Sequence, residues 1–577
     1  NRRTHEARDI QPKAGYGEKL RFNWNTPLHL TRKGTLYIGA QFLFRSRDRG
    51  RTWERISPDL TTNDPDKQKQ EQSGGITVDN SSAEMHTTIY TICESPRNEQ
   101  VIWAGTDDGN LQVTRDGGKS WTNVPPMLGS WVSWVEASPH DEATAYAAVD
   151  RHTFGDMQPH VFRTADYGRT WQRIAGPPVR GFAHVVREDP ERRGLLYVGT
   201  EFGLWISPDA GHTWAEFKGG NFPAVPVRDL AFQPRDGDLV IGTHGRGIWI
   251  IDDLTPLRGL RLDREVAFLP SRPAQQRIPG IGGGVEGDAK FTGENPPSGA
   301  LISYYQSKRH LFGPLRLEIV GPDGKVVDTL PAEKRRGINR VTWPMRVKPP
   351  RVPRGASATY SGSVGPRVLP GTYTVRLVKG DQTCESTLQV GLDRRAEFSL
   401  EERQQQYTAA MRVHALFGEM TALSETLQAT RQAALERGDP ELTGFADRCE
   451  ELRKKIVATK EGGAITGEER LREHADNLYG ALLSYEGKPP AYLLERIEVL
   501  QRELGDVSRE YETLSSEINR KLEERGLPPL RPQVSVEEET TLSSGDLQKA
   551  FARFLGFPAG QETPRKGARR RFWRTTH

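Results

Sequence analysis

The sequence predicts a mainly β protein of several domains: repeated small antiparallel sheets, then a β-sandwich, then a helical bundle. Three observations lead to this prediction. An eight-residue pattern, [ST]-x-D-x-G-x-[ST]-W, occurs four times in the first half of the chain. Strand-like stretches recur there about every 46 residues, which is typical of folds built from small repeated sheets. Beyond residue 397 the apolar residues instead follow the spacing of helices.

Composition limits the classes of function. The chain has 577 residues with 80 Lys and Arg against 76 Asp and Glu, a formal net charge of +4. This balance does not favour nucleic acid as a partner. The three cysteines, Cys93, Cys384 and Cys449, are far apart, which predicts neither a disulfide framework nor a metal site. No cofactor is predicted, and no apolar run is long enough for a transmembrane helix.

The four copies of the pattern begin at residues 46, 114, 164 and 207. Asp in a tight turn accepts hydrogen bonds from backbone N–H groups, and Gly permits the positive φ of such a turn. Trp then starts a strand and offers a large surface for packing between sheets. A carboxylate used by its own turn is a poor catalytic acid. We therefore expect a structural role for Asp48, Asp116, Asp166, Asp209, Trp53, Trp121, Trp171 and Trp214.

Residues 1–255 are predicted to form about five propeller blades. Most units contain a run that ends in Gly and a small residue, such as Leu195-Leu-Tyr-Val-Gly199-Thr200. A unit of roughly 46 residues matches one four-stranded blade. The fifth unit, around residues 247–254, lacks the pattern, as terminal repeats often do. We expect these blades to belong to a larger propeller, completed by upstream blades or by a partner chain.

Residues 256–300 are predicted to be a linker because Gly and Pro clusters interrupt any regular element. Residues 301–393 are predicted to form a β-sandwich. Two strand-like runs flank Gly321-Pro-Asp-Gly324, which is a hairpin signal. The segment resembles the small immunoglobulin-like modules that follow the propellers of some secreted bacterial proteins.

Residues 397–526 are predicted to form a helical bundle or coiled-coil hairpin. Ser399 and Glu402 have the spacing of a capping box. Gly438-Asp-Pro440, Gly462-Gly463 and Pro489-Pro490 separate four helical stretches. The tail, 527–577, is expected to be partly disordered, with one short helix near residues 545–555 and a basic end.

Candidate binding residues come from the loop that precedes the pattern in each unit. Successive strands of a blade are antiparallel, so this loop lies at the end of the sheet opposite the pattern. Equivalent positions in the five units would surround one mouth of a propeller. The alternative is ordinary polar loop surface. The candidates are Gln41, Asp107, Asp108, Asp150, Arg151, His152, Glu201, His244 and Arg246.

Glycoside hydrolysis needs two carboxyl groups on either side of the scissile bond. Asp107 or Asp108 together with Glu201 is the only such pair that the repeats suggest. No histidine has a spacing that indicates a metal ligand.

The repeated pattern resembles the Asp-box, or BNR repeat, and the wider chain resembles the C-terminal part of bacterial sortilin/VPS10-like BNR-repeat proteins. The segment Thr243-His-Gly-Arg-Gly-Ile-Trp-Ile-Ile-Asp-Asp253 also carries this resemblance. It implies a multi-blade propeller, an extracytoplasmic location, and a binding or scaffolding role for protein or glycan ligands. The alternative is a secreted glycoside hydrolase of the sialidase or xyloglucanase kind. The resemblance supplies no catalytic residues.

Overall fold

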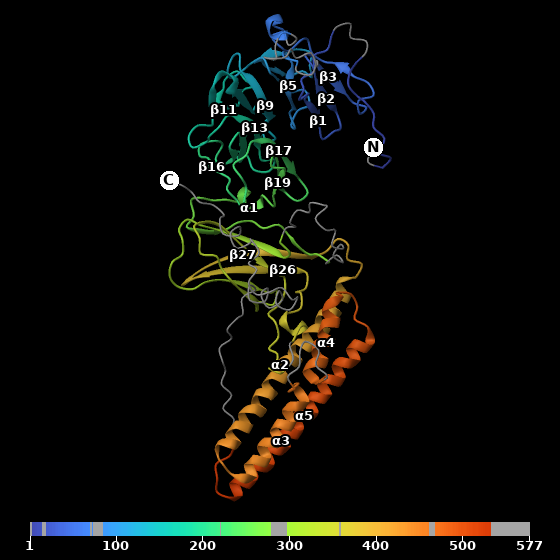
Figure 1. Cartoon of the computed structure of the whole chain (residues 1–577), viewed down its shortest axis with the longest axis vertical. Coiled ribbons are helices and arrows are strands. Elements are labelled where there is room, and N and C mark those ends of the chain that lie inside the picture. Colours follow the sequence, from blue (N-terminus) through green and yellow to red (C-terminus); the bar gives the residue numbers. More distant parts are fainter. Residues whose placement is uncertain are drawn as a thin grey trace. The chain divides into compact units, whose positions relative to one another are not determined.

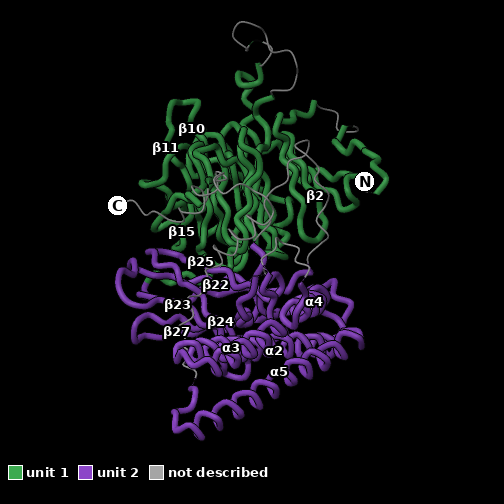
Figure 2. The backbone as a smooth tube through the Cα atoms, turned by 60° about the horizontal axis from the view of Figure 1, so that its bottom comes forward, with its two compact units in different colours: residues 1–262, 562–577 green, residues 263–561 purple. Residues whose placement is uncertain are grey.

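The computed structural model describes residues 3–13, 19–69, 72, 85–219, 221–278, 297–356, 359–460 and 468–531. The chain divides after Leu262 into two compact units, which Figure 2 shows in different colours. The first unit is built from β-sheets, and the second combines sheets with long helices (Figure 1). The predicted mainly β chain with a C-terminal helical region is confirmed. The predicted tail helix near residues 545–555 and the basic end lie outside the described residues.

Within its described residues, the first unit contains five antiparallel sheets in chain order, four of four strands and a last one of three. Each strand pairs with the next along the chain, so every sheet is a simple meander. The strands are β1 Leu28–Leu30, β2 Leu36–Gly39, β3 Leu43–Ser46, β4 Glu54–Arg55, β5 Ile89–Glu94, β6 Ile102–Thr106, β7 Leu111–Thr114, β8 Thr122–Asn123, β9 Trp131–Ala137, β10 Ala145–Arg151, β11 Asp156–Thr164, β12 Gln172–Arg173, β13 Ala183–Glu188, β14 Leu196–Thr200, β15 Gly203–Ser207, β16 Ala215–Glu216, β17 Val227–Gln233, β18 Asp238–Thr243 and β19 Ile248–Ile251. Short 3-10 turns lie at Pro65–Gln68 and His152–Phe154, and a one-turn helix, α1, at Thr255–Arg258.

Neighbouring sheets pack face to face through their first and second strands. A Cβ atom added to Gly105 in β6 would lie 2.6 Å from Val132 in β9 of the next sheet. The same holds for Gly39 with Ile89, at 2.9 Å, and for Gly199 with Val227. Gly in the repeated run is therefore required because the next sheet's first strand lies directly on it.

The second unit begins with two sheets that share one buried core. Trp343, Tyr304 and Leu317, from both sheets, are at most 1% exposed. Residues 256–300, expected to be a linker, instead contain the last three residues of α1 and two strands, and one of those strands pairs in parallel with a later strand, Gln382–Leu392. The sheets run in the orders β20-β22-β25 and β21-β27-β26-β23-β24, with strands β20 Val266–Phe268, β21 Ala274–Gln276, β22 Ala300–Gln306, β23 Leu315–Val320, β24 Val326–Pro331, β25 Gly337–Trp343, β26 Gly371–Lys379 and β27 Gln382–Leu392, and with a 3-10 turn at Ser361–Ser363.

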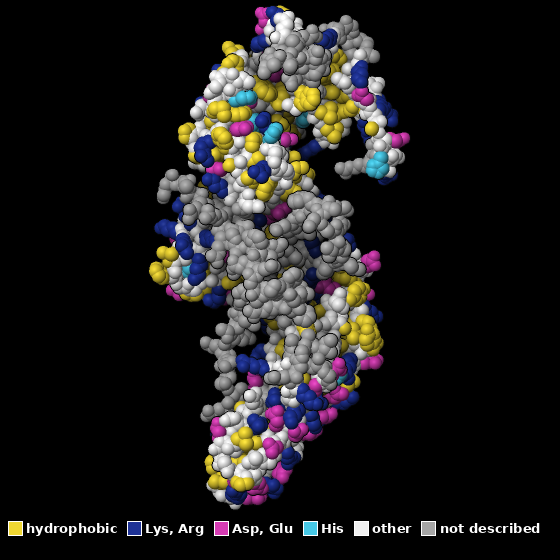
Figure 3. Space-filling view, viewed as in Figure 1, with side chains coloured by type: hydrophobic (Ala, Val, Ile, Leu, Met, Phe, Trp, Pro, Cys, Tyr) yellow, Lys and Arg dark blue, Asp and Glu magenta, His cyan; other side chains and the backbone are white. Residues whose placement is uncertain are grey.

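Four helices of the described residues complete the second unit: α2 Leu400–Glu436, α3 Pro440–Ile456, α4 Leu471–Ser484 and α5 Ala491–Glu524. The expected capping box is present, because the Ser399 hydroxyl accepts from the Glu402 N–H and the Glu402 carboxylate from the Ser399 N–H. Asp476 of α4 accepts the backbone N–H groups of Tyr360 and Gly362, which fixes the loop after β25 on the helices. Figure 3 shows charges of both signs mixed along the helices.

Candidate functional site

Each copy of the repeated pattern folds into the same turn. In the second sheet, Asp116 accepts hydrogen bonds from the Ser120 N–H at 2.9 Å and from the hydroxyls of Ser120 and Thr114 at 2.6 and 2.8 Å. The Thr114 hydroxyl in turn accepts from the Gly118 N–H. Equivalent bonds surround Asp48, Asp166 and Asp209. These hydrogen bonds lower the pKa of all four carboxyl groups.

The tryptophan of each pattern joins its sheet to the segment before it. The indole N–H of Trp171 donates to the backbone oxygen of Val124, at 2.8 Å. Trp121 donates to Ile56 and Trp214 to Ile174 in the same way. In the first sheet the acceptor of Trp53 is Ile10.

At the opposite end of the sheets lie the loops between second and third strands, which we call the mouth: residues 40–42, 106–110, 150–156, 200–203 and 243–247. Asp107 and Asp108 are only 9% and 3% exposed there. Asp107 accepts from the N–H and hydroxyl of Thr88 and from the Asn23 amide. Asp108 accepts from the N–H and hydroxyl of Thr62 and from the Thr106 hydroxyl. Burial raises the pKa of Asp107, and both carboxylates hold loops together.

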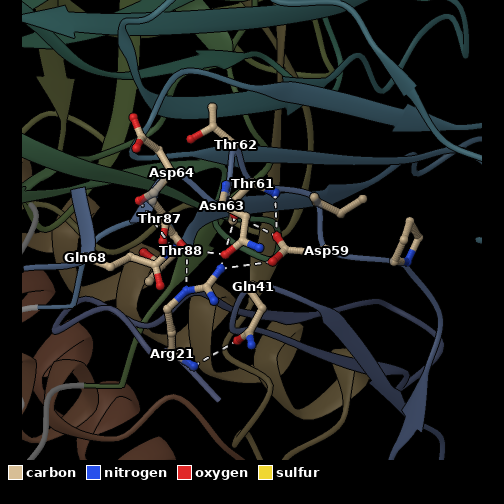
Figure 4. A network of polar contacts seen from close by, with 12 residues as sticks. Arg21, Gln41, Asp59, Thr61, Thr62, Asn63, Asp64, Gln68, Thr87 and Thr88 are labelled. Carbon is tan, nitrogen blue, oxygen red and sulfur yellow. Dashed lines mark hydrogen bonds and ion pairs between the residues drawn. The ribbon is translucent and has the colours of Figure 1, made fainter. Parts of the chain in front are cut away.

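Gln41 is also buried, at 2% exposure, and holds the segment before the first sheet. Its amide oxygen accepts from the Arg21 N–H and its amide nitrogen donates to the Lys19 backbone. Figure 4 shows the network that follows: the Arg21 guanidinium reaches Asp59 at 3.0 Å and the backbone oxygen of Thr87 at 3.2 Å. Gln41 therefore has its hydrogen-bonding groups occupied within the protein.

The third sheet presents a more accessible group. Asp150, 4% exposed, accepts from the Nδ1–H of His152 at 2.7 Å. The His152 ring stacks on Phe182 of the fourth sheet, with centroids 4.6 Å apart. The centroid of the Trp131 ring lies 6.5 Å from that of His152, with the two rings tilted by 45°. Arg151 next to it donates to the Ser130 hydroxyl and lies over the exposed Phe154 ring.

The fourth sheet supplies a carboxylate–histidine–arginine group. His184 donates from Nε2 to Glu201 at 2.9 Å, and Arg228 of the fifth sheet approaches His184 Nδ1 at 3.4 Å. Arg228 also lies 3.9 Å from Glu201. Burial and the Arg228 charge lower the pKa of His184. Because the Arg228 guanidinium can only donate at Nδ1, the contacts place the ring proton on Nε2, toward Glu201. Glu201 is ion-paired with Arg228, and it shares no hydrogen-bond partner with Asp107 or Asp108.

Sequence reasoning missed several residues of this site. First strands of the second to fifth sheets each contain a register shift at the same place. The extra residue is Tyr90, Ser133, His184 or Arg228, and a β-bulge of this kind redirects a side chain. Each lies 16 or 17 residues before the equivalent mouth residue, Asp107, Asp150, Glu201 or His244. This constant spacing is the sequence signal by which these residues could have been predicted. Trp131 and Phe182 were also missed, because their aromatic contacts join different sheets.

Two expected residues, His244 and Arg246, are exposed on the loop of the fifth sheet. Among the residues that the structure describes, no group of three or more His, Cys, Asp or Glu side chains is arranged to hold a metal ion. Within the same ranges, no helix combines the length and apolarity needed to cross a membrane.

Comparison with known proteins gives a partial relationship. No family model matches the chain. A xyloglucanase of Hypocrea jecorina is 30% identical over 140 residues, covering 21% of this chain and 16% of that protein. The xyloglucanase Xgh74A of Acetivibrio thermocellus is 25% identical over 176 residues, 27% of this chain and 20% of that protein. The chain thus matches a fifth or less of these relatives.

Among solved structures, the β-propeller domain of Cps50 (Swd1) from Myceliophteria thermophila is 15% identical with a TM-score of 0.30, covering 41% of this chain and 67% of that one. The structure defines a mainly β protein with repeated antiparallel sheets, and part of its sequence is similar to a fifth or less of the xyloglucanases above.

Proposed function

We propose that the first unit is a propeller-type binding module that holds an extended glycan across the mouth and does not cleave it. The binding surface is formed by Trp131, His152, Phe154, Glu201 and Arg228. The observation that carries this proposal is the convergence of aromatic rings and a fixed charge group from three successive sheets at one end of the unit.

The chemistry of these side chains suits a sugar chain. Aromatic rings offer apolar faces to the C–H groups of a sugar, while carboxylate, imidazole and guanidinium groups bind its hydroxyls. Phe154 is 65% exposed and His152 about two-fifths exposed, so both are accessible to a ligand. The partial similarity to xyloglucanases favours a β-glucan as the ligand.

The alternative is a glycoside hydrolase, which the same similarity favours. It needs a pair of free carboxyl groups, one of them protonated. The surroundings of the expected carboxyl pair disfavour hydrolysis. Asp107 and Asp108 are buried and accept three hydrogen bonds each, and Glu201 contacts His184 and Arg228, so these groups are already bound within the protein.

Binding is tested by titrating the full chain with xyloglucan oligosaccharides in a calorimeter. We expect His152→Ala and Arg228→Ala each to weaken binding about tenfold while both variants stay folded at the temperature of the titration. Phe312→Ala, at an 86% exposed ring of the second unit, is the matched control. Absence of binding, or equal affinity in all variants, would contradict the proposal.

Finer assignments belong to the same proposal. The turns described above support the Asp-box, or BNR, interpretation of the repeats, and with it the relationship to sortilin/VPS10-like proteins. The two-sheet core of the second unit supports an immunoglobulin-like module. An extracytoplasmic location belongs to the same proposal, since xyloglucan, the β-glucan that the similarity favours, lies outside the cytoplasm.

A further inference from the structure

In the part of the chain that the structure describes, the fifth sheet has one covered face and one uncovered face. Leu230, Ile241 and Trp249 are cross-strand neighbours that pack on the fourth sheet. Side chains alternate between the two faces of a strand. Ala231, Val240 and Ile250 therefore form the opposite row, and Gly242 pairs with Ile248 beside it.

This second face carries accessible apolar side chains, with the carboxylate-bearing Asp229 opposite Gly242 at one end of it. Ile248 is 75% exposed and Ile250 is 57% exposed, although both lie inside a strand. In the preceding sheet the corresponding third strand, β15, is buried along its whole length. Apolar strand residues left open in this way indicate a surface that another element covers.

The other sheets show what covers the equivalent face. Gly39, Gly105 and Gly199 each lie under the first strand of the next sheet. The residue that touches the glycine is Ile89, Val132 or Val227, and in each case it directly precedes the bulged residue. In the third sheet, which has Ala148 at this position, the corresponding residue is the smaller Ala183 in the same buried cluster. A glycine in one sheet thus meets the larger Ile or Val of the next sheet, and an alanine meets an alanine, so the side-chain volumes of the two facing positions are matched.

Gly242 is the equivalent glycine of the fifth sheet, and its site is open. A Cβ atom added there would meet nothing closer than 3.6 Å, and that contact is with Asp229 of its own sheet. The fifth sheet therefore keeps the small residue that an incoming strand requires, while the described chain places no strand on it.

We propose that this face, formed by Ala231, Val240, Gly242, Ile248 and Ile250, binds a further propeller blade of the same repeat. The blade's first strand carries Ile or Val over Gly242, immediately before a β-bulge. The first sheet of a second copy does not offer this strand, because β1 pairs with β2 without a register shift. The inference is independent of the ligand proposed for the mouth.

A polypeptide of residues 86–217, which starts with the Ile89–Tyr90 strand, is the probe. It is added to the full chain, and hydrogen–deuterium exchange of peptides spanning residues 238–251 is measured with and without it. We expect at least tenfold slower exchange with the probe. The probe carrying Ile89→Gly, and the full chain carrying Gly242→Val or Ile248→Lys, should lose this protection. Phe312→Lys in the second unit is the matched control.

Two results would overturn the proposal. One is that exchange of residues 238–251 stays unchanged when the probe is at saturating concentration. This holds for a folded and for an unfolded probe, because docking on the sheet would order an unfolded probe. The other is self-association of the full chain in sedimentation experiments that Ile248→Lys abolishes, because a second copy would then be the occupant.

Discussion

The carboxylates at the two ends of the sheets differ in their surroundings. Those of the repeated turns are bound by their own hydroxyl and N–H groups, while Glu201 at the mouth is held by side chains of two sheets. Residue type alone therefore does not identify a functional acid; the source of its hydrogen bonds does.

One prediction concerns Asp166. Hydrogen bonds from Thr170 and Thr164 lower its pKa from 3.8 to about 2. A carboxyl group whose pKa is depressed by folding stabilises the fold above its unfolded pKa, and this contribution is lost as the pH falls through the folded value. Asp166→Asn should be less stable than the original chain at pH 7, and the difference should shrink between pH 4 and pH 2. Urea unfolding at these pH values measures it, with Asp381→Asn as the control; a pH-independent difference would contradict it.

A second prediction separates stability from binding. Asp209→Ala removes the acceptor of three hydrogen bonds in its turn and should lower the free energy of unfolding by about 1–2 kcal/mol. Asp116→Ala should also lower the melting temperature. Both variants should keep the affinity for xyloglucan oligosaccharides. A large loss of affinity with an unchanged melting temperature would show that these residues act in binding instead.

At the scale of elements, the glycines at the sheet interfaces allow a direct comparison. Gly199→Val should destabilise the chain by about 1–3 kcal/mol, because the added methyl groups overlap Val227 of the next sheet. Gly242→Val should change stability little, because its site is open. Urea midpoints of the two variants test this. An equal loss in both would mean that the fifth sheet is covered in solution.

Local signals predicted the elements well where they act within a few residues. The Ser399 capping box and the breaks at Gly438 and Pro490 predicted where α2, α3 and α5 begin, because caps and prolines act locally. Strand β21 was missed because it has three residues and depends on pairing with β27, more than a hundred residues away. The bulges were missed because a register shift is set by the partner strand.

The candidate site was predicted in part for the same reason. Repeat register indicated Asp150, His152 and Glu201 as mouth residues, since equivalent positions follow from the sequence. It also indicated Gln41 and Asp107, which are buried by contacts from segments before their own sheets. Such contacts between distant segments have no local signal in the sequence.

At the scale of the whole molecule, the described chain combines a unit of repeated sheets with a second unit of two sheets and four helices. Positive and negative side chains alternate along those helices in pairs such as Lys455 with Glu510, 2.7 Å apart. Exposed pairs of this kind contribute little to stability, so the buried core of the helices carries it. All residues proposed to bind the glycan lie in the first unit, so the helices do not enter that proposal.

Turnover tests the central claim, binding without cleavage, most directly. The full chain is incubated with xyloglucan at pH 5 to 8, and released reducing ends are measured over a day beside the Glu201→Gln variant. The account predicts that neither protein releases products above a no-protein control, although the full chain binds the oligosaccharides. Clear hydrolysis that Glu201→Gln abolishes would contradict it and make Glu201 a catalytic residue.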